Sequence, residues 1–375
     1  MMAFRSRANR QKPWLIQKYK GKGYVDTSKA PRWWISQPDK IEKYLRSLKD
    51  VEVFEIGRSA GGRPIIAAAW GRKEILPGRT SNSLSSAIAG GSTSAFYGKG
   101  VRKRQTFIFL GAAHGTEIEG TVAALNFLNV VITGKDLRGR AWPVMAEQGR
   151  KLRIVIVPIF NMDGRERMHN SLHFIGIHPD AGREIGQGHF KNGEKLDWPR
   201  SKLYVPIPKD KVAFMGTYFN DNGYNLVYDF GFAGGECQPE TKALGKLIRD
   251  ELPDCVLCSH SDNGSLAQPP DSFVPAHYRQ RQLQLGAIVG SRPKYEGMKK
   301  WSVTQRLETY AGQQFYQTDM IHHMSGALPL VVEFPCGYQN YPDNHAEILD
   351  IGMTVLEEIV KFGTYFGFKP RDPKP

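Results

Sequence analysis

The feature that most constrains this fold is a set of short apolar segments that are typical of strands buried on both faces. They lie at residues 106–110, 153–160, 255–258 and 328–334. Strands of this kind occur in largely parallel sheets that helices cover on both sides. Helical patterns separate or follow them, at residues 118–131, 239–252 and 346–362. This alternation predicts an α/β fold: a single-domain sandwich with a mixed, mainly parallel central sheet flanked by helices.

Outside this core the patterns are simpler. Residues 37–48 predict a helix, and residues 51–56 and 64–70, separated by glycines, predict a β-hairpin. Residues 76–100 are rich in Ser and Gly without periodicity, which predicts a surface loop. About 70 residues rich in Gly, Pro, Asn and Asp follow residue 160, and so long a stretch indicates functional loops.

These patterns divide the chain into one main domain and two flanking segments. Residues 1–35 are polar, basic and aromatic, and we expect them to form an extended arm. The main domain is expected over residues 36–365, and residues 366–375 are expected to form a short tail.

Composition limits the classes of partner. The 375 residues carry a formal net charge of +14, which favours acidic partners through long-range attraction. No zinc-finger, RNA-recognition or basic-zipper pattern accompanies the charge, so we expect no nucleic-acid partner. No apolar run approaches the roughly 20 residues of a membrane span, so we expect no membrane partner. Four cysteines are too few for a disulfide scaffold, and without a visible signal peptide they favour a cytoplasmic location.

Polar side chains follow several of the predicted strands directly. His114 and Glu117 lie three residues apart where the first buried strand passes into a helix, and His260 follows the third buried strand. The carboxyl ends of parallel strands gather at one edge of such a sheet. Two histidines and a carboxylate leave a fourth tetrahedral position open, which is the composition of a catalytic zinc site. A helix-capping role for Glu117 is the structural alternative.

A second acid stands at the same predicted edge. Glu333 follows four apolar residues in the last strand, where a lone carboxylate is costly to bury unless it is paired or functional. It is therefore a candidate general base for a zinc-bound water.

The order of these motifs resembles the zinc carboxypeptidase family of the carboxypeptidase A type. The shared order is His-x-x-Glu after a strand, an Asn-Pro-Asp-Gly-like turn, a strand-end His, and a Glu near the C-terminus. Here the turn reads Asn161-Met162-Asp163-Gly164, with Met in place of Pro. The segment at residues 56–65 also resembles the first hairpin of that family, and the resemblance spans roughly residues 40–362.

The resemblance implies one Zn²⁺ per chain, held by His114, Glu117 and His260, with a water in the open position. Glu333 would take the proton from that water and pass it to the leaving amine. The family also places an arginine next to a tryptophan to stabilise the oxyanion. The nearest match is Trp198-Pro199-Arg200, which assigns this role to Arg200.

The substrate-binding segment departs from the family pattern. Carboxypeptidases hold the free C-terminal carboxylate with an Asn-Arg pair, whereas the matching segment here offers Asn225 and Tyr228 without an arginine. Arginine suits bidentate carboxylate recognition and tyrosine does not. Arg165 or Arg183 is a possible substitute. Tyr310 and Tyr316 both lie where the family has its substrate-covering tyrosine, and a purely structural role as packed aromatic side chains is the alternative for both.

The sequence therefore predicts a zinc-dependent peptidase that removes a C-terminal residue from a peptide, which can be acidic. A related amidase or deacylase acting on acyl-amino acids or side-chain-linked acidic chains is the alternative within the enzyme class. A non-catalytic binding module with the same fold is the alternative outside it. The sequence gives neither the side-chain preference nor the oligomeric state.

Overall fold

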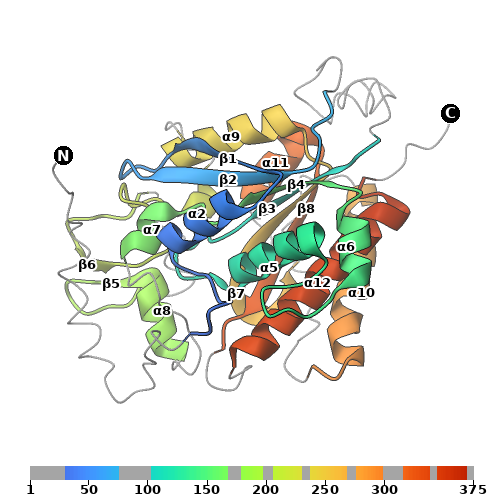
Figure 1. Cartoon of the computed structure of the whole chain (residues 1–375). Helices are drawn as coiled ribbons and strands as arrows, with labels where there is room; N and C mark the ends of the chain where they lie inside the picture. Colours follow the sequence, from blue (N-terminus) through green and yellow to red (C-terminus); the bar gives the residue numbers. More distant parts are fainter. Residues whose placement is uncertain are drawn as a thin grey trace.

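The structure is a computed structural model of the whole chain (Figure 1). The residues that it describes are 30–75, 103–167, 179–196, 206–229, 237–267, 276–298, 316–337 and 344–369, with backbone alone at 179–181, 263–267 and 294. Most of the predicted N-terminal arm and the whole of the predicted loop at residues 76–100 lie outside the described residues.

A six-stranded sheet forms the centre of the molecule. Its strands are β1 (Val51–Arg58), β2 (Pro64–Trp70), β3 (Thr106–Leu110), β4 (Arg153–Val157), β7 (Cys255–Ala267) and β8 (Leu328–Pro335). They are arranged in the order β1-β2-β4-β3-β7-β8. The β1–β2 and β2–β4 pairs are antiparallel, whereas β4–β3, β3–β7 and β7–β8 are parallel. The predicted mixed, mainly parallel sheet and the predicted hairpin are confirmed.

Helices cover both faces of this sheet (Figure 1). On one face lie α5 (Glu119–Thr133), α6 (Pro143–Gly149), α10 (Ala276–Tyr295) and α12 (His345–Phe366). On the other lie α9 (Pro239–Glu251) and α11 (Gln317–Ser325). The predicted N-terminal helix is α2 (Pro38–Ser47), which buries Ile41 and Leu45. None of the helices among the described residues combines the length and apolar character needed to cross a bilayer.

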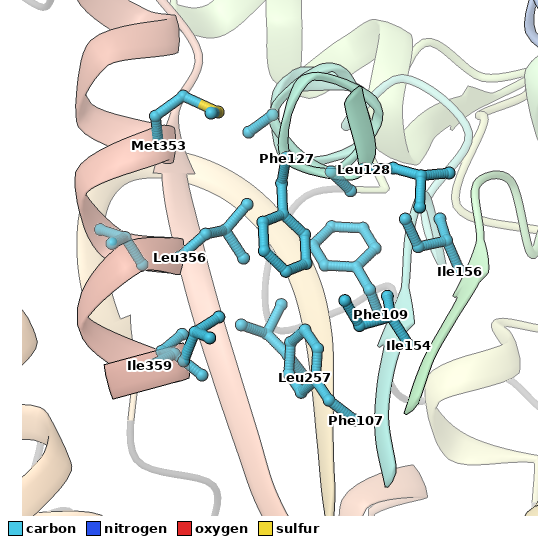
Figure 2. Packing of buried hydrophobic residues seen from close by; sticks show 14 of the residues in the cluster. Phe107, Phe109, Phe127, Leu128, Ile154, Ile156, Leu257, Met353, Leu356 and Ile359 are labelled. Atoms are coloured by element: carbon cyan, nitrogen blue, oxygen red, sulfur yellow. The ribbon is translucent and has the colours of Figure 1, made fainter. Parts of the chain in front are cut away.

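Two apolar layers hold the sheet between the helices. Figure 2 shows the larger one, in which Phe107 and Phe109 of β3 meet Phe127 of α5. Cys255 belongs to this layer and Cys258 to the opposite one, as expected for strand residues three apart. Both thiols are free and fully buried.

Residues just outside the predicted main domain, on both sides of it, pack into the same core. Trp34 is 4% exposed, and Phe368 is fully buried and stacks on Phe107 with ring centroids 6.1 Å apart. The division of the chain into arm, main domain and tail stays a prediction.

Several element boundaries differ from the sequence-based expectation. The strand predicted at residues 153–160 ends at Val157, because Pro158 has no N–H to donate to a ladder. The strand predicted at residues 255–258 continues to Ala267 through a polar stretch that pairs with β8. Pairing with a neighbouring strand outweighs the low strand propensity of Asp, Asn and Gly there.

The long stretch after residue 160 is not loop throughout. It contains α7 (Met162–Arg167), α8 (Pro179–Gln187), β5 (Gly188–Phe190), β6 (Val212–Met215) and the 3-10 turn η4 (Leu226–Tyr228). Strands β5 and β6 form a separate two-stranded sheet at the left of Figure 1. These elements are too short to leave a clear periodic pattern in the sequence.

Gly120 of α5 has no room for a side chain. A Cβ there would lie 2.0 Å from Ser259 Oγ of β7 and 2.7 Å from the Phe334 ring of β8. Close contact between α5 and these two strands therefore requires glycine at this position.

We predict that replacing two helical glycines by alanine changes the stability of the protein in different ways. Gly120→Ala should lower the free energy of unfolding by about 1–3 kcal/mol through overpacking. Gly245→Ala in α9 meets only the flexible end of Met324, at 3.4 Å, and should leave stability unchanged or raise it by up to about 1 kcal/mol. Urea unfolding of both variants in the presence of chelator measures the difference. Equal stability of the two variants would contradict the packing described here.

Candidate metal centre

The turn after β3 aims His114 and Glu117 at one point. Its backbone is fixed to the segment after β4, because Phe160 and Asn161 donate to the carbonyls of Gly111 and Ala112. Ala112 has a φ of 47°, a left-handed conformation that a non-glycine residue adopts only when its surroundings impose it. The strain lies two residues before His114, where the chain turns from strand to helix.

The other histidine comes from β7. His260 is paired in parallel register with Glu333 of β8, and His260 is 8% exposed whereas Glu333 is half-buried. Neighbours in register on adjacent strands present their side chains on the same face of the sheet. The strand pairing therefore brings the predicted base to the histidine, although 72 positions separate them along the sequence.

Three of the predicted residues converge. The Nδ1 atom of His114 lies 2.9 Å from Glu117 Oε1, and the Nδ1 atom of His260 lies 2.9 Å from Glu117 Oε2. One ligand atom from each of the three residues falls within 4.8 Å of the other two, and all three side chains are buried. Among the described residues, this is the one group of three or more His, Cys, Asp or Glu side chains that could hold a metal ion.

The electrostatics of the group show how strongly its members interact. Burial would raise the pKa of Glu117, but attraction and hydrogen bonds from His114 and His260 lower it to about 2. Burial lowers the pKa of His114 in spite of that carboxylate. Burial acts the same way on His260, but the hydrogen bond and charge of Glu117 raise the pKa of this imidazole to about 9.

This donor set fits a zinc ion. Imidazole nitrogen and carboxylate oxygen are both ordinary zinc ligands, and three protein ligands leave a position open for water or substrate. Each oxygen of Glu117 faces a different imidazole through the same kind of ring atom, Nδ1. A divalent cation among these atoms would also compensate the buried negative charge.

Two further side chains contact the His114 ring, and this contact is not predicted from the sequence for either of them. Tyr218 stacks on the imidazole with ring centroids 3.6 Å apart and planes 2° from parallel. Asn225, predicted to bind substrate, has its Oδ1 3.3 Å from His114 Nε2. No motif distinguishes Tyr218 in the sequence, because it follows a short strand that is itself hard to predict.

The predicted substrate residues lie partly within the described structure. Tyr228 lies at the end of η4, and its ring centroid is 5.2 Å from that of Tyr316. Burial raises the pKa of Tyr228 well above its ordinary value, and Tyr316 and the charges of Glu333 and Glu117 add to the effect. The effect of the Glu333 and Glu117 charges on this pKa indicates that Tyr228 lies close to the candidate metal centre. Arg200 and Tyr310 lie outside the described residues.

Arg165 has a different task from carboxylate binding. Its side chain is fully buried, and it donates to the carbonyl of Gly115 at 3.2 Å and to that of Ser36 at 3.0 Å. Gly115 also donates its N–H to the carbonyl of Thr217. Arg165 therefore fixes the turn that carries the two ligands. The other possible substitute, Arg183, is exposed on α8.

The Asn-Met-Asp-Gly turn joins the first hairpin to this region. Asp163 is fully buried and accepts hydrogen bonds from Ser59 Oγ, the Gly61 N–H and the Arg63 guanidinium, at 2.5, 2.9 and 2.6 Å. The two sequence segments that carry the resemblance are thus in direct contact.

A buried His-Glu-His group at the carboxyl ends of parallel strands, with a second acid beside it, defines the class of zinc-type metallohydrolase sites. The sequence matches the family model described as zinc carboxypeptidase over residues 41–329. Because that match covers more than half of the chain, the protein belongs to the zinc carboxypeptidase family and is a peptidase by family. Glu333 lies just beyond the matched range.

Solved structures of metallo-carboxypeptidases share the fold. A metallo-carboxypeptidase from Burkholderia cenocepacia is 16% identical with a TM-score of 0.52, over 86% of this chain and 68% of that one. A metallo-carboxypeptidase from Pseudomonas aeruginosa, in complex with (2-guanidinoethylmercapto)succinic acid, is 12% identical with a TM-score of 0.52, over 87% and 68% of the two chains. Bovine thrombin-activatable fibrinolysis inhibitor, in complex with tick carboxypeptidase inhibitor, is 12% identical with a TM-score of 0.52, over 88% and 98%. No curated protein matches the sequence.

We predict that zinc binding depends steeply on pH. The pKa of His260 is raised to about 9, so at neutral pH zinc must displace a proton from this imidazole. The apparent affinity should therefore rise about tenfold per pH unit from pH 7 toward pH 9 and level off above it. Competition with a chromogenic chelator, corrected for the protonation of the chelator, measures this slope. An affinity that is constant across the window would contradict the pairing of His260 with Glu117.

Proposed function

We propose that this protein is a zinc-dependent hydrolase that cleaves the peptide bond before a C-terminal residue. The observation that carries the proposal is the convergence of His114, Glu117 and His260, with Glu333 in register beside His260. The family supplies the zinc dependence and the reaction class.

In this proposal the two imidazoles and Glu117 hold one zinc ion per chain. When bound, zinc polarises the scissile carbonyl and lowers the pKa of a coordinated water. The buried ligand set holds the ion in a fixed position, because the turn after β3 and the register of β7 both fix the ligands. Arg165 stabilises the same turn by donating a hydrogen bond to the Gly115 carbonyl.

Glu333 is the proposed proton carrier. Its carboxylate takes a proton from the attacking water as the water oxygen bonds to the carbonyl carbon. It then gives that proton to the amide nitrogen as the C–N bond breaks, so the carboxylate is regenerated. The half-buried position of Glu333 beside a buried imidazole supports this role, since the carboxylate can reach both the site and its water.

The remaining assignments concern the substrate. We propose that Arg200 stabilises the oxyanion and that Tyr310 covers the substrate. Tyr228 keeps its phenolic proton because burial and nearby negative charge raise its pKa, which suits it to donate a hydrogen bond to the substrate. Asn225 is proposed to lie along the substrate path, although its carbonyl oxygen is directed at His114.

The chain-level assignments follow the sequence prediction. We propose that the catalytic domain lies within residues 36–365, between a basic arm and a short tail. All four cysteines are free thiols, which supports a reducing compartment such as the cytoplasm. The net charge of +14 supports acidic peptides as preferred substrates.

A second candidate function is an amidase or deacylase that does not require a free α-carboxylate. The position of Arg165 favours it, because this arginine is buried and bonded to two backbone carbonyls. It therefore does not take the place of the family's carboxylate-binding arginine.

We predict that Glu333→Gln separates metal binding from catalysis. The amide has nearly the same shape but takes no proton, so kcat should fall by about 10²–10⁴-fold or more. Zinc content should stay at the wild-type value, because Glu333 is not a proposed ligand. Peptide hydrolysis and metal analysis on the same preparation measure both effects. A variant with wild-type activity would refute the assignment of Glu333.

We predict that peptides with a free C-terminal acid are hydrolysed and that their C-terminal amides are not. The amide lacks the charge that an exopeptidase recognises, so kcat/KM should fall by more than 100-fold, a difference of about 2.7 kcal/mol in transition-state binding. Equal rates on both would favour the amidase or deacylase instead. Zinc-loaded and chelator-treated enzyme serve as the control for metal dependence.

A further inference from the structure

We propose that residues 30–36, which we call the N-terminal strap, help to set the zinc affinity of the site by holding Arg165, a positioning residue of the turn after β3. The family match begins at residue 41, so the strap lies outside the part of the chain that the family model covers. The inference rests on the metal site of the proposed function and is independent of its substrate.

Arg165 connects the strap to the turn that carries His114 and Glu117. Its Nη1 donates to the Gly115 carbonyl at 3.2 Å, and its Nη2 donates to the Ser36 carbonyl at 3.0 Å. Arg165 is fully buried and Ser36 is 5% exposed, so water has little access to either hydrogen bond. The two donor nitrogens belong to one rigid plane, so the positions of the two carbonyls depend on one another.

The turn after β3 packs directly on the backbone that carries Arg165. A Cβ at Gly115 would lie 2.3 Å from the Arg165 backbone nitrogen and 2.3 Å from the Gly164 carbonyl carbon. No side chain separates the two segments, so a shift of Arg165 also moves Gly115. Gly115 directly follows His114 in the sequence, so the displacement reaches a proposed zinc ligand.

Aromatic side chains anchor the strap to the rest of the fold. Trp34 is 4% exposed and packs edge-on against His345 at the start of α12, with ring centroids 4.8 Å apart. The Arg138 guanidinium lies 5.5 Å from the centre of the Trp33 ring. The backbone N–H of Trp34 donates to the Pro31 carbonyl at 2.9 Å. These contacts, and not the metal ligands themselves, hold the strap on the core.

A buried acid helps to keep Arg165 charged. Burial lowers the pKa of Arg165 to about 10, and the charge of Glu119 opposes this shift. The guanidinium is therefore charged at neutral pH, and its hydrogen bonds to the two carbonyls are of the stronger, charge-assisted kind. Loss of either carbonyl would leave part of a buried charge without a partner, which is costly. The favoured state is the one in which the strap and the turn are both in place.

Thermodynamic linkage makes this coupling reciprocal. If release of the strap weakens zinc binding by a certain factor, bound zinc opposes release of the strap by the same factor. Residues that support zinc ligands from outside the coordination sphere commonly change the affinity by 10–100-fold, so we expect a factor of about ten here.

The first test measures the zinc Kd of variants of the full chain by chelator competition. Trp34→Ala removes the main anchor of the strap, so the Kd should rise about tenfold. Trp34→Phe keeps a buried ring and should stay close to the wild-type Kd, because Trp34 Nε1 makes no hydrogen bond among the described residues. Phe368→Ala is the matched control, since Phe368 is a buried aromatic near the other end of the chain that stacks on Phe107. It should lower stability and leave the Kd unchanged.

A variant of the connecting residue tests the route of the coupling. Arg165→Lys keeps the positive charge near Glu119 but replaces the planar fork by a single donor nitrogen, so the Kd should rise about tenfold. Combined with Trp34→Ala it should show little further loss, because the connection is already broken. Two independent effects would instead multiply to about 100-fold.

A second measurement needs no variant. Hydrogen exchange of the full wild-type chain is compared in saturating zinc and in chelator. Zinc should slow exchange of the Trp34 backbone N–H about tenfold by opposing local opening of the strap. The backbone N–H of Phe368 donates to Gln105 Oε1 at 2.8 Å and is the control, which should exchange at the same rate in both conditions.

Three results would overturn the proposal. The first is a folded Trp34→Ala variant with the same zinc Kd as Phe368→Ala. The second is a multiplicative effect of Trp34→Ala and Arg165→Lys, and the third is a strap that exchanges equally fast with and without zinc. A protein that shows the coupling but cleaves no peptide would refute the proposed function and leave this inference standing. A zinc-dependent peptidase without the coupling would refute this inference alone.

Discussion

The structure depends on one buried carboxylate between two imidazoles. Glu117, His114 and His260 are each less than 10% exposed, and three ionisable groups removed from water are stable only when they compensate one another. They do so through the two contacts of Glu117. This mutual attraction fixes the turn after β3 against the middle of β7, where His260 lies. The same arrangement offers a divalent ion one ligand atom from each of the three residues, all within 4.8 Å of one another.

The rest of the fold serves to hold these three side chains in place. The parallel pairing of β3, β7 and β8 brings the strand ends together, and Gly120 lets α5 approach β7 and β8 closely. Arg165 supports the ligand turn from within the core. Asp163 of the Asn-Met-Asp-Gly turn connects that turn to the β1–β2 hairpin through its hydrogen bonds with Ser59 and Gly61. Hydrogen bonds to charged groups at buried positions are among the stronger ones, so these contacts can fix a site accurately.

Much of the fold and of the metal-ligand group could be predicted from the sequence, because the sequence patterns that indicate them are local or follow a general rule. Continuous apolar strands predicted the parallel sheet, and the rule that polar residues gather at strand ends predicted that His114 and His260 meet. The structure confirms both the sheet and this meeting. The positions of Arg200 and Tyr310 remain predictions.

Other features depend on tertiary contacts that leave no local pattern. Helix α10 buries Leu285 and Val289 among many polar residues, so its apolar face is weakly marked in the sequence. The outer half of β7 is held by its pairing with β8 and not by residue propensity. Tyr218 reaches His114 across about 100 residues of chain, and Asn225 is oriented by Val227, so neither role can be inferred from spacing alone.

The most direct test of the central claim is a crystal structure of the zinc-loaded protein with anomalous data collected at the zinc edge. We predict one anomalous peak per chain, bonded to Nδ1 of His114, Nδ1 of His260 and the carboxylate of Glu117, at about 2.0–2.2 Å from each. A peak bonded to other side chains, or coordination of His114 through Nε2, would contradict it.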